Sequence, residues 1–280
     1  MERRLERPPG HVGELAARAS YYARLLGAQL RLSALLSLQY RADFFSDGLT
    51  SLLWLSFTVM PLWVAFHARS TIAGWTFAES LVVLGLFTFL KGVMDGAINP
   101  SLTAVVEQVR KGTLDFALLK PADAQFLIST ARFQPWKSAD VVGGVAIGVY
   151  AFARIGHAPR LSGALAGALL LAAALAVLYS LWILTISAAF YVVRLDNLAY
   201  LFASIFDLGR WPISFFRGIY RLLFTFLLPL AIMTTYPASA LLGRLSGASL
   251  AWALCGTALF ALFSRGVWNR SIGHYTSASS

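Results

Sequence analysis

The stretch LSGALAGALLLAAALAVLYSLWILTISAAFYVV, residues 161–193, contains no Asp, Glu, Lys or Arg. As an α-helix rising about 1.5 Å per residue, it would be ~50 Å long, which exceeds the ~30 Å hydrocarbon core of a bilayer. Residues 48–66, 222–243 and 245–264 also lack charged side chains. Uncharged runs of ~18 or more residues are typical of transmembrane helices. These stretches predict an integral membrane protein.

The overall composition favours the same class. Of the 280 residues, 58% are hydrophobic and only 13% are charged, and the mean hydropathy is +0.67. A soluble domain usually has about 25% charged residues, so this chain has too little polar surface to face water on all sides. We expect an all-α integral membrane fold with about six transmembrane helices.

The pattern along the chain predicts one transmembrane domain, at residues 21–270, between tails at 1–20 and 271–280. Within 21–42, Arg24 and Arg31 lie seven residues apart and leucines cluster on another side, which favours a helix lying at the membrane interface. The six crossings are expected at about 48–66, 80–99, 139–155, 163–193, 222–236 and 245–264.

The basic residues indicate the orientation of the chain. With the amino terminus inside, most of them fall in cytoplasmic segments, among which we count the connection from Arg194 to Arg221. The opposite side then holds only Arg69, Arg154, Arg160 and Arg244. Because cytoplasmic loops are rich in Lys and Arg, both termini are expected in the cytoplasm. The same rule explains the net charge of +10 without nucleic-acid binding, since no basic patch alternates with aromatic residues as base stacking requires.

The sequence lacks the motifs of common enzyme sites. It has no phosphate-binding loop, no His-Glu-x-x-His zinc motif and no Gly-x-Ser-x-Gly nucleophile elbow. Its histidines, His11, His67, His157 and His274, lie far apart, and Cys255 is the single cysteine. We expect no catalytic residue, no metal site, no intrachain disulfide and no cofactor in this chain.

Two charged residues lie inside the second expected crossing. Lys91 and Asp95 have the i, i+4 spacing that places both on one helix face, where each offsets the desolvation of the other. They belong either to a substrate or proton path or to a structural ion pair.

Two Gly-x-x-x-Gly pairs occur in successive crossings: Gly144 with Gly148, and Gly163 with Gly167. Small residues let helix backbones approach closely in lipid. We expect these faces to pack against each other or against another subunit.

A short amphipathic helix is expected directly after the second crossing. Ser101 can cap its start, and Gly112 is a natural stop. Between them, apolar residues follow at helical spacing: Leu102, Val105, Val106 and Val109. Such a helix would lie parallel to the inner membrane surface, where it either meets a cytoplasmic partner or rests on lipid.

This segment carries a family resemblance. VRKGTLDFALLKP, residues 109–121, resembles a signature of ABC-2 type transporter permeases. DLGRWPI at 207–213 resembles the family's connection before the fifth crossing. LPLA at 228–231, with YPA at 236–238 and LLG at 241–243, resembles its fifth crossing and outer turn. The likeness extends over residues 20–270 in the same order.

The resemblance implies a type V exporter-like architecture in a bacterial inner membrane. It implies a second permease subunit, identical or different, and a separate ABC ATPase that binds ATP and Mg. Residues 101–111 would form the coupling helix, and the connection at 194–217 would add a weaker contact. The implied ATPase contacts are Glu107, Arg110, Lys111 and Asp115, with Ser101 as the cap and Gly112 as the turn.

Family members move drugs, lipids or lipid-linked polymers, and we expect the first, second and fifth crossings to line the substrate path. Two other functions stay open from the sequence. One is an ion-coupled secondary carrier that uses Lys91 and Asp95. The other is a membrane scaffold that recruits a cytoplasmic protein through residues 101–111.

Overall fold

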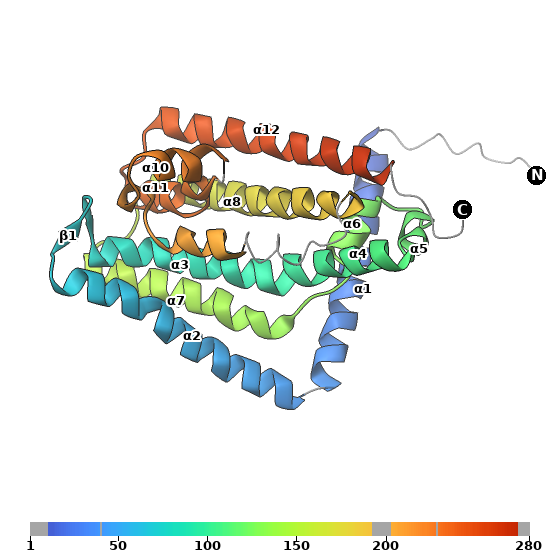
Figure 1. Cartoon of the computed structure of the whole chain (residues 1–280), viewed down its shortest axis with the longest axis horizontal. Helices are drawn as coiled ribbons and strands as arrows, with labels where there is room; N and C mark the ends of the chain where they lie inside the picture. The colour runs from blue at the N-terminus through green and yellow to red at the C-terminus, as the bar shows by residue number, and fades with distance from the viewer. Residues whose placement is uncertain (1–10, 40, 192–202, 228, 274–280) are drawn as a thin grey trace, which may run out of the picture.

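The computed structural model describes residues 11–39, 41–191, 203–227 and 229–273, and they form a helical bundle (Figure 1). The elements are α1 (His11–Gln39), α2 (Arg41–His67), β1 (Thr71–Ile72), β2 (Trp75–Thr76), α3 (Phe77–Val93), η1 (Met94–Ile98), α4 (Asn99–Lys111), α5 (Asp115–Leu118), α6 (Ala124–Ser129), η2 (Pro135–Lys137), α7 (Ser138–Ile155), α8 (Leu161–Ser187), η3 (Ala188–Phe190), η4 (Asp207–Arg210), η5 (Ile213–Phe215), α10 (Ile219–Leu222), η6 (Leu223–Leu227), η7 (Ala231–Thr235), α11 (Tyr236–Leu241) and α12 (Gly247–Ile272).

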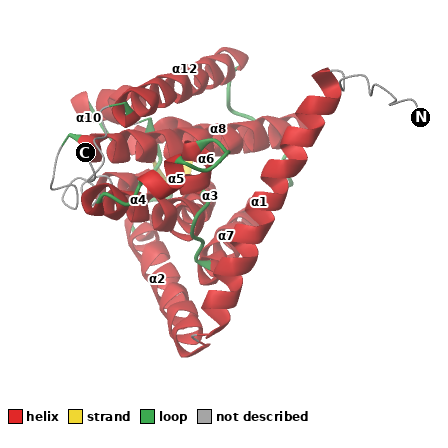
Figure 2. Cartoon of the chain, turned by 90° about the vertical axis from the view of Figure 1, so that its right-hand side faces the viewer, coloured by secondary structure: helices red, strands yellow, loops and turns green. Residues whose placement is uncertain are grey.

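The bundle has two distinct ends. At one end lie the antiparallel β1–β2 hairpin, α10, α11 and the first turns of α8 and α12 (Figure 1). We call it the hairpin end. At the other end, α1 lies obliquely across the bundle (Figure 2) and contacts α6, where the Tyr22 ring lies 4.8 Å from that of Phe126, and α4 and α5 lie at this end as well (Figure 1). We call this the α1 end.

The all-α membrane class is confirmed. Among the described residues, four helices are long and apolar enough to cross a membrane: Phe77–Val109, Pro135–Ile155, Leu161–Ser187 and Gly247–Ile272. The 27 residues of α2 would also reach ~40 Å. Three expected boundaries need correction, because α1 begins at His11 inside the expected tail, α12 continues to Ile272, and the long uncharged run ends as an α-helix at Ser187.

The second crossing and the expected coupling helix form one continuous helix, so a separate helix lying along the membrane surface is not what the chain forms. α3 begins with a capping box in which Thr76 and Glu79 bond reciprocally. It passes through the π turn η1 directly into α4. Pro100 has no N–H to offer Gly96 four residues before it, and the Gly96 carbonyl instead accepts from the Gln134 N–H at 2.8 Å. The proline is thus accommodated without ending the helix.

α3 packs most extensively against α7, through glycines of both helices. A Cβ added at Gly85 would lie 2.8 Å from the carbonyl oxygen of Gly144, and one at Gly144 would lie 2.4 Å from the amide nitrogen of Phe89. The backbones therefore touch. The expected pairing of the two Gly-x-x-x-Gly faces is wrong, because the first pair, Gly144 and Gly148, meets α3.

The second pair packs on a different element. Cβ atoms added at Gly163 and Gly167 would meet the Ala240 carbonyl and the Leu241 side chain at 2.7 Å each. Both partners belong to α11, which lies against the first turns of α8.

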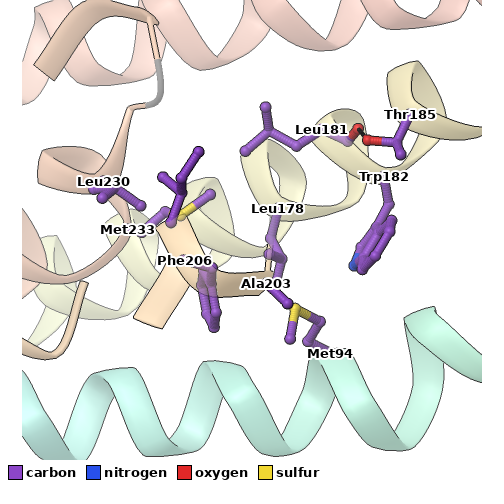
Figure 3. Close-up of a pocket in the computed structure, with 10 residues that line it drawn as sticks. Met94, Leu178, Leu181, Trp182, Thr185, Ala203, Phe206, Leu230 and Met233 are labelled. Carbon is purple, nitrogen blue, oxygen red and sulfur yellow. Dashed lines mark hydrogen bonds between the residues drawn. The ribbon is translucent and has the colours of Figure 1, made fainter. Parts of the chain in front are cut away.

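The described part of the connection before α10, residues 203–218, packs against the bundle, whereas the sequence predicts a cytoplasmic connection. Phe206 is buried, and its ring centroid lies 5.2 Å from that of Phe87 on α3, with the two rings tilted. Figure 3 shows Ala203 and Phe206 between Met94 and the α8 side chain of Leu178. The chain then reaches the hairpin end, where the Phe215 ring lies 6.4 Å from Phe66 at the end of α2. Arg194 lies outside the described residues.

Residues 222–236 do not form the expected fifth crossing. They belong to a broken helical segment in which α10 and α11 both lie at the hairpin end (Figure 1). Thr234 donates to the Gly209 carbonyl at 2.8 Å, and the Thr235 hydroxyl accepts from the Ile213 N–H at 3.0 Å. These bonds hold the segment around residues 234–235 against residues 209–213. As a result, Arg217 and Arg221 also lie at the hairpin end.

Candidate functional site

The first candidate site is the turn that ends the continuous α3–α4 helix. Gly112 adopts a left-handed conformation with φ of 66°, and its N–H bonds to the Val109 carbonyl at 3.2 Å. The Thr113 N–H bonds to the Gln108 carbonyl at 2.9 Å. This is the hydrogen-bond pattern of a glycine helix stop, as the sequence predicts. The chain reverses here into α5.

The turn presents apolar side chains outward. Leu114 is fully buried and anchors the reversal, whereas Phe116 is 71% exposed and Leu119 is 82% exposed. Lys111 pairs with Glu107 at 2.7 Å on the exposed side of α4. We call residues 107–119 the α4 tip. It combines a charged helix face with protruding apolar groups, and we take it as the candidate docking surface.

The expected coupling residues are only partly grouped. Glu107, Lys111, Gly112 and Asp115 lie at the α4 tip, whereas the side chain of Arg110 is outside the described atoms. Ser101 is not a helix cap. It is buried inside the helix, donates to the Arg132 carbonyl at 2.6 Å and accepts from the Arg132 N–H at 2.9 Å. Ser101 therefore joins α4 to the segment before α7.

A polar cluster holds the segment after the α4 tip against the bundle. Asp123 caps α6 by accepting from the Phe126 N–H at 2.9 Å, and its carboxylate forms an ion pair with Arg265 of α12. The hydrogen bond from Arg265 lowers the pKa of Asp123, and the Phe126 N–H acts in the same direction. Tyr179 of α8 bonds to Gln125 at 3.0 Å. The cluster therefore ties the segment that follows the α4 tip to α8 and α12.

The second candidate site is an intramembrane charge cluster around Lys91. Its ammonium lies 3.9 Å from Asp95, which confirms the expected pairing, and 3.3 Å from Asp207. Asp207 also pairs with Arg210 at 3.4 Å, and the Arg210 guanidinium lies 5.8 Å from the Phe87 ring centroid. Asp95 sits in the π turn, a widened turn that frequently marks functional positions in helices.

Lys91, Asp207 and Arg210 face a cavity of about 550 Å³ between α2, α3, the start of α7 and η4. A volume of this size is typical of small-molecule sites, which measure about 300–1,000 Å³. The lining residues are Thr50, Trp54, Thr58, Phe87, Thr88, Lys91, Gln134, Trp136, Lys137, Asp140, Asp207 and Arg210.

Several of these residues were not found from the sequence. The sequence places Asp207 and Arg210 in the connection from Arg194 to Arg221, which we count as cytoplasmic from its basic residues. The apolar residues on both sides of DLGR, Ile205 and Phe206 before it and Trp211 and Ile213 after it, were the available signal. The Asp123–Arg265 pair had no signal, because its partners are separated by 142 residues.

Comparison with known proteins gives one match. A family model described as "ABC-2 family transporter protein" matches residues 52–279. No curated protein matches the chain, and no solved structure does. The family match covers both the α4 tip and the charge cluster.

Proposed function

Because this chain belongs to the ABC-2 transporter family, we propose that it is the membrane subunit of an exporter driven by a separate ABC ATPase. The family assignment makes it a permease of an ABC transporter, and it confirms the resemblance recognised in the sequence. Export, the ATPase partner and a drug-like, lipid or lipid-linked substrate are the parts that we propose. ATP and Mg would be bound by the ATPase, and this chain would contact the surrounding lipid.

One observation carries the proposal. A single continuous helix runs from the capping box at Thr76 past Lys91 and Asp95 to the α4 tip. A helix is stiff over this length, so a push on the tip would displace the charge cluster directly. The exposed Phe116 and Leu119 would fill a groove of the ATPase, and Glu107 and Lys111 would contact its rim.

ATP can drive such a movement only if the ATPase binds it more tightly in one state of the whole complex than in another. We propose that closure of two ATPase subunits pushes two α4 tips and rocks the paired permeases against each other. The Asp123–Arg265 pair would carry the movement on to α12.

The proposed orientation places the α1 end in the cytoplasm of a bacterial cell, with both termini there. The α1 end carries Lys111, Lys120, Arg132, Lys137, Arg265 and Arg270 in addition to the basic residues of α1, whereas the hairpin end carries Arg69, Arg154, Arg160, Arg217, Arg221 and Arg244. The difference in the number of basic residues between the two ends is smaller than the sequence suggested. The α1 end still carries more of them, which favours a cytoplasmic α1 end.

The coupling test uses two variants of the α4 tip and one control. Glu107→Arg reverses the charge opposite Lys111, and Gly112→Pro replaces a residue whose φ of 66° proline cannot adopt. Gly156 ends α7 at the hairpin end with φ of 88°, so Gly156→Pro imposes a comparable strain away from the tip.

We expect both tip variants to insert normally and to lose coupling between vanadate-sensitive ATPase activity and transport in proteoliposomes that also contain the ATPase. The Gly156→Pro variant should stay coupled. Unchanged transport in both tip variants would reject the assignment of the α4 tip. Failure of any neighbouring-gene ATPase to co-purify with the chain would reject the ATPase partnership.

An ion-coupled carrier is the second candidate, and the charge cluster is the observation that favours it. Four ionisable groups, Lys91, Asp95, Asp207 and Arg210, lie in one network inside the bundle. Transport that continues with vanadate but stops when the proton gradient is collapsed would favour this function over the ATP-driven one.

A further inference from the structure

The charges that line the 550 Å³ cavity are unequal in sign. Three cations face it, Lys91, Lys137 and Arg210, against two carboxylates, Asp140 and Asp207. Each carboxylate is already engaged. Asp140 pairs with Lys137 at 3.4 Å, and Asp207 is shared between Lys91 at 3.3 Å and Arg210 at 3.4 Å. The lining therefore has one more cation than carboxylate, and the carboxylate that balances this excess, Asp95, contacts Lys91 from outside the lining.

The sharing of Asp207 leaves both of its cations with capacity for another anion. Lys91 has three N–H donors and Arg210 has five, and one carboxylate cannot accept from all of them. Asp95 contributes only a longer contact to Lys91, at 3.9 Å. An anionic group that enters the cavity can bond to Lys91 and Arg210 at once, and such charge-assisted bonds are the stronger class of hydrogen bond.

The rest of the lining is uncharged and consists of three aromatic residues and four polar ones, Thr50, Thr58, Thr88 and Gln134. Trp54, Phe87 and Trp136 face the cavity together with the charges. Trp54 is also 65% exposed, and Leu53 and Phe57 beside it on α2 are exposed as well. The cavity is therefore continuous with an apolar face of α2, and a molecule can place a charged group inside while its apolar part lies along that helix.

We propose that this cavity binds an anionic amphiphile, whose carboxylate or phosphate pairs with Lys91, Lys137 and Arg210 and whose apolar part contacts Trp54 and the adjoining face of α2. The inference rests on the proposed transport function and names the chemical class of the substrate. Asp207 is then an internal competitor, because it occupies the same cations when the cavity holds no anion. Its return to Lys91 and Arg210 offsets the cost of leaving two partly buried cations without a close carboxylate when the substrate departs.

The test measures binding to the full-length chain alone in phosphatidylcholine nanodiscs, so it does not depend on the ATPase. The probe is radiolabelled dodecyl phosphate, compared with dodecyltrimethylammonium and dodecyl maltoside, each corrected for binding to empty nanodiscs. Only dodecyl phosphate should bind in a saturable way. Phosphatidylglycerol added to the nanodiscs separates two sources of the ligand. Competition identifies a membrane lipid, and its absence identifies an amphiphile from outside the bilayer lipids.

Substitutions in the cavity should change the affinity for dodecyl phosphate in opposite directions. Lys91→Gln and Arg210→Gln should weaken dodecyl phosphate binding about tenfold or more, since each removes a bond to a charged group. Asp207→Asn should strengthen binding several-fold, because it removes the internal competitor. Arg154→Gln and Arg160→Gln, which remove equal charge at the hairpin end, should leave binding unchanged. If Lys91→Gln fails to fold, the Lys91→Gln/Asp95→Asn double variant removes the charge without leaving Asp95 unpaired.

Equal binding of the three amphiphiles would overturn the inference, as would dodecyl phosphate binding that is unchanged in the cavity variants or weakened by Asp207→Asn. ATP-driven transport could still hold in that case, because the α4 tip variants test it separately. Conversely, the chain could fail to associate with an ATPase and still bind anions selectively. That result would reject the proposed function, whereas the assignment of the cavity would hold.

Discussion

At the scale of single residues, two glycines of the same helix have very different surroundings. A Cβ at Gly144 would lie 2.4 Å from the Phe89 amide nitrogen and 2.6 Å from the Gly85 carbonyl oxygen, whereas a Cβ at Gly148 would meet nothing within 4 Å. Both belong to one Gly-x-x-x-Gly pair, so the motif does not distinguish them. The difference arises because α7 crosses α3 at Gly144.

We therefore expect Gly144→Ala to destabilise the chain by about 1–3 kcal/mol, since the added methyl group must push two backbones apart. Gly148→Ala is the matched control and should change stability very little. Thermal unfolding of both purified variants in one detergent checks this. Equal midpoints for Gly144→Ala and the unsubstituted chain would contradict the observed contact between α3 and α7.

At the scale of elements, the segment from α10 to α11 differs most from its sequence expectation. Its residues are apolar enough for a crossing, but Pro229 interrupts the helix before η7, and Gly218 turns the chain with φ of 59°. Arg244 follows α11 and pairs with Glu79 in the first turn of α3. The start and the end of the segment from α10 to α11 thus both lie at the hairpin end of the bundle.

Cysteine labelling can test this topology in a Cys255→Ser background. Ile219→Cys and Ala248→Cys flank the returning segment, and His157→Cys marks the turn between α7 and α8. All three should react with a membrane-impermeant maleimide from the same side, and Leu119→Cys at the α4 tip should react only from the other. If Ile219→Cys were labelled from the Leu119 side, residues 222–236 would be a true crossing.

At the scale of the whole molecule, the charged cavity requires a cover. Lys91, Asp207 and Arg210 line a space whose rim includes the exposed Trp54, and charged groups facing hydrocarbon are costly. A second permease subunit against α2 would shield them, and the family resemblance implies such a pairing. α12 lies on the opposite side of the bundle from α2 (Figure 1).

This arrangement predicts which helix lies at the subunit interface. In a Cys255→Ser background, Trp54→Cys or Phe57→Cys should form dimers with a membrane-permeant bis-maleimide, and Trp252→Cys on α12 should not, although all three positions are exposed. Denaturing gels after cross-linking in membranes give the measurement. Dimers formed only through Trp252→Cys would move the interface to α12 and leave the cavity open to lipid.

The sequence by itself determined the membrane class, the helical stop at Gly112 and the pairing of Lys91 with Asp95. Each depends on local properties, namely a long uncharged run, a left-handed backbone that favours glycine, and the i, i+4 spacing of a helix. Three stretches in the same order, at 109–121, 207–213 and 228–243, also indicated the family.

Only the tertiary structure decided that α3 and α4 are one helix, that Asp207 and Arg210 join Lys91 inside the bundle, and that the two glycine pairs pack on different partners. Because Pro100 has no N–H, it cannot donate to the Gly96 carbonyl four residues before it. That carbonyl accepts a hydrogen bond from the N–H of Gln134, 38 positions further along the chain, and the helix continues. Charged residues such as Asp207 are equally compatible with a loop or an interior site until their partners are known. Contacts between distant segments carry no local pattern, and they formed the site.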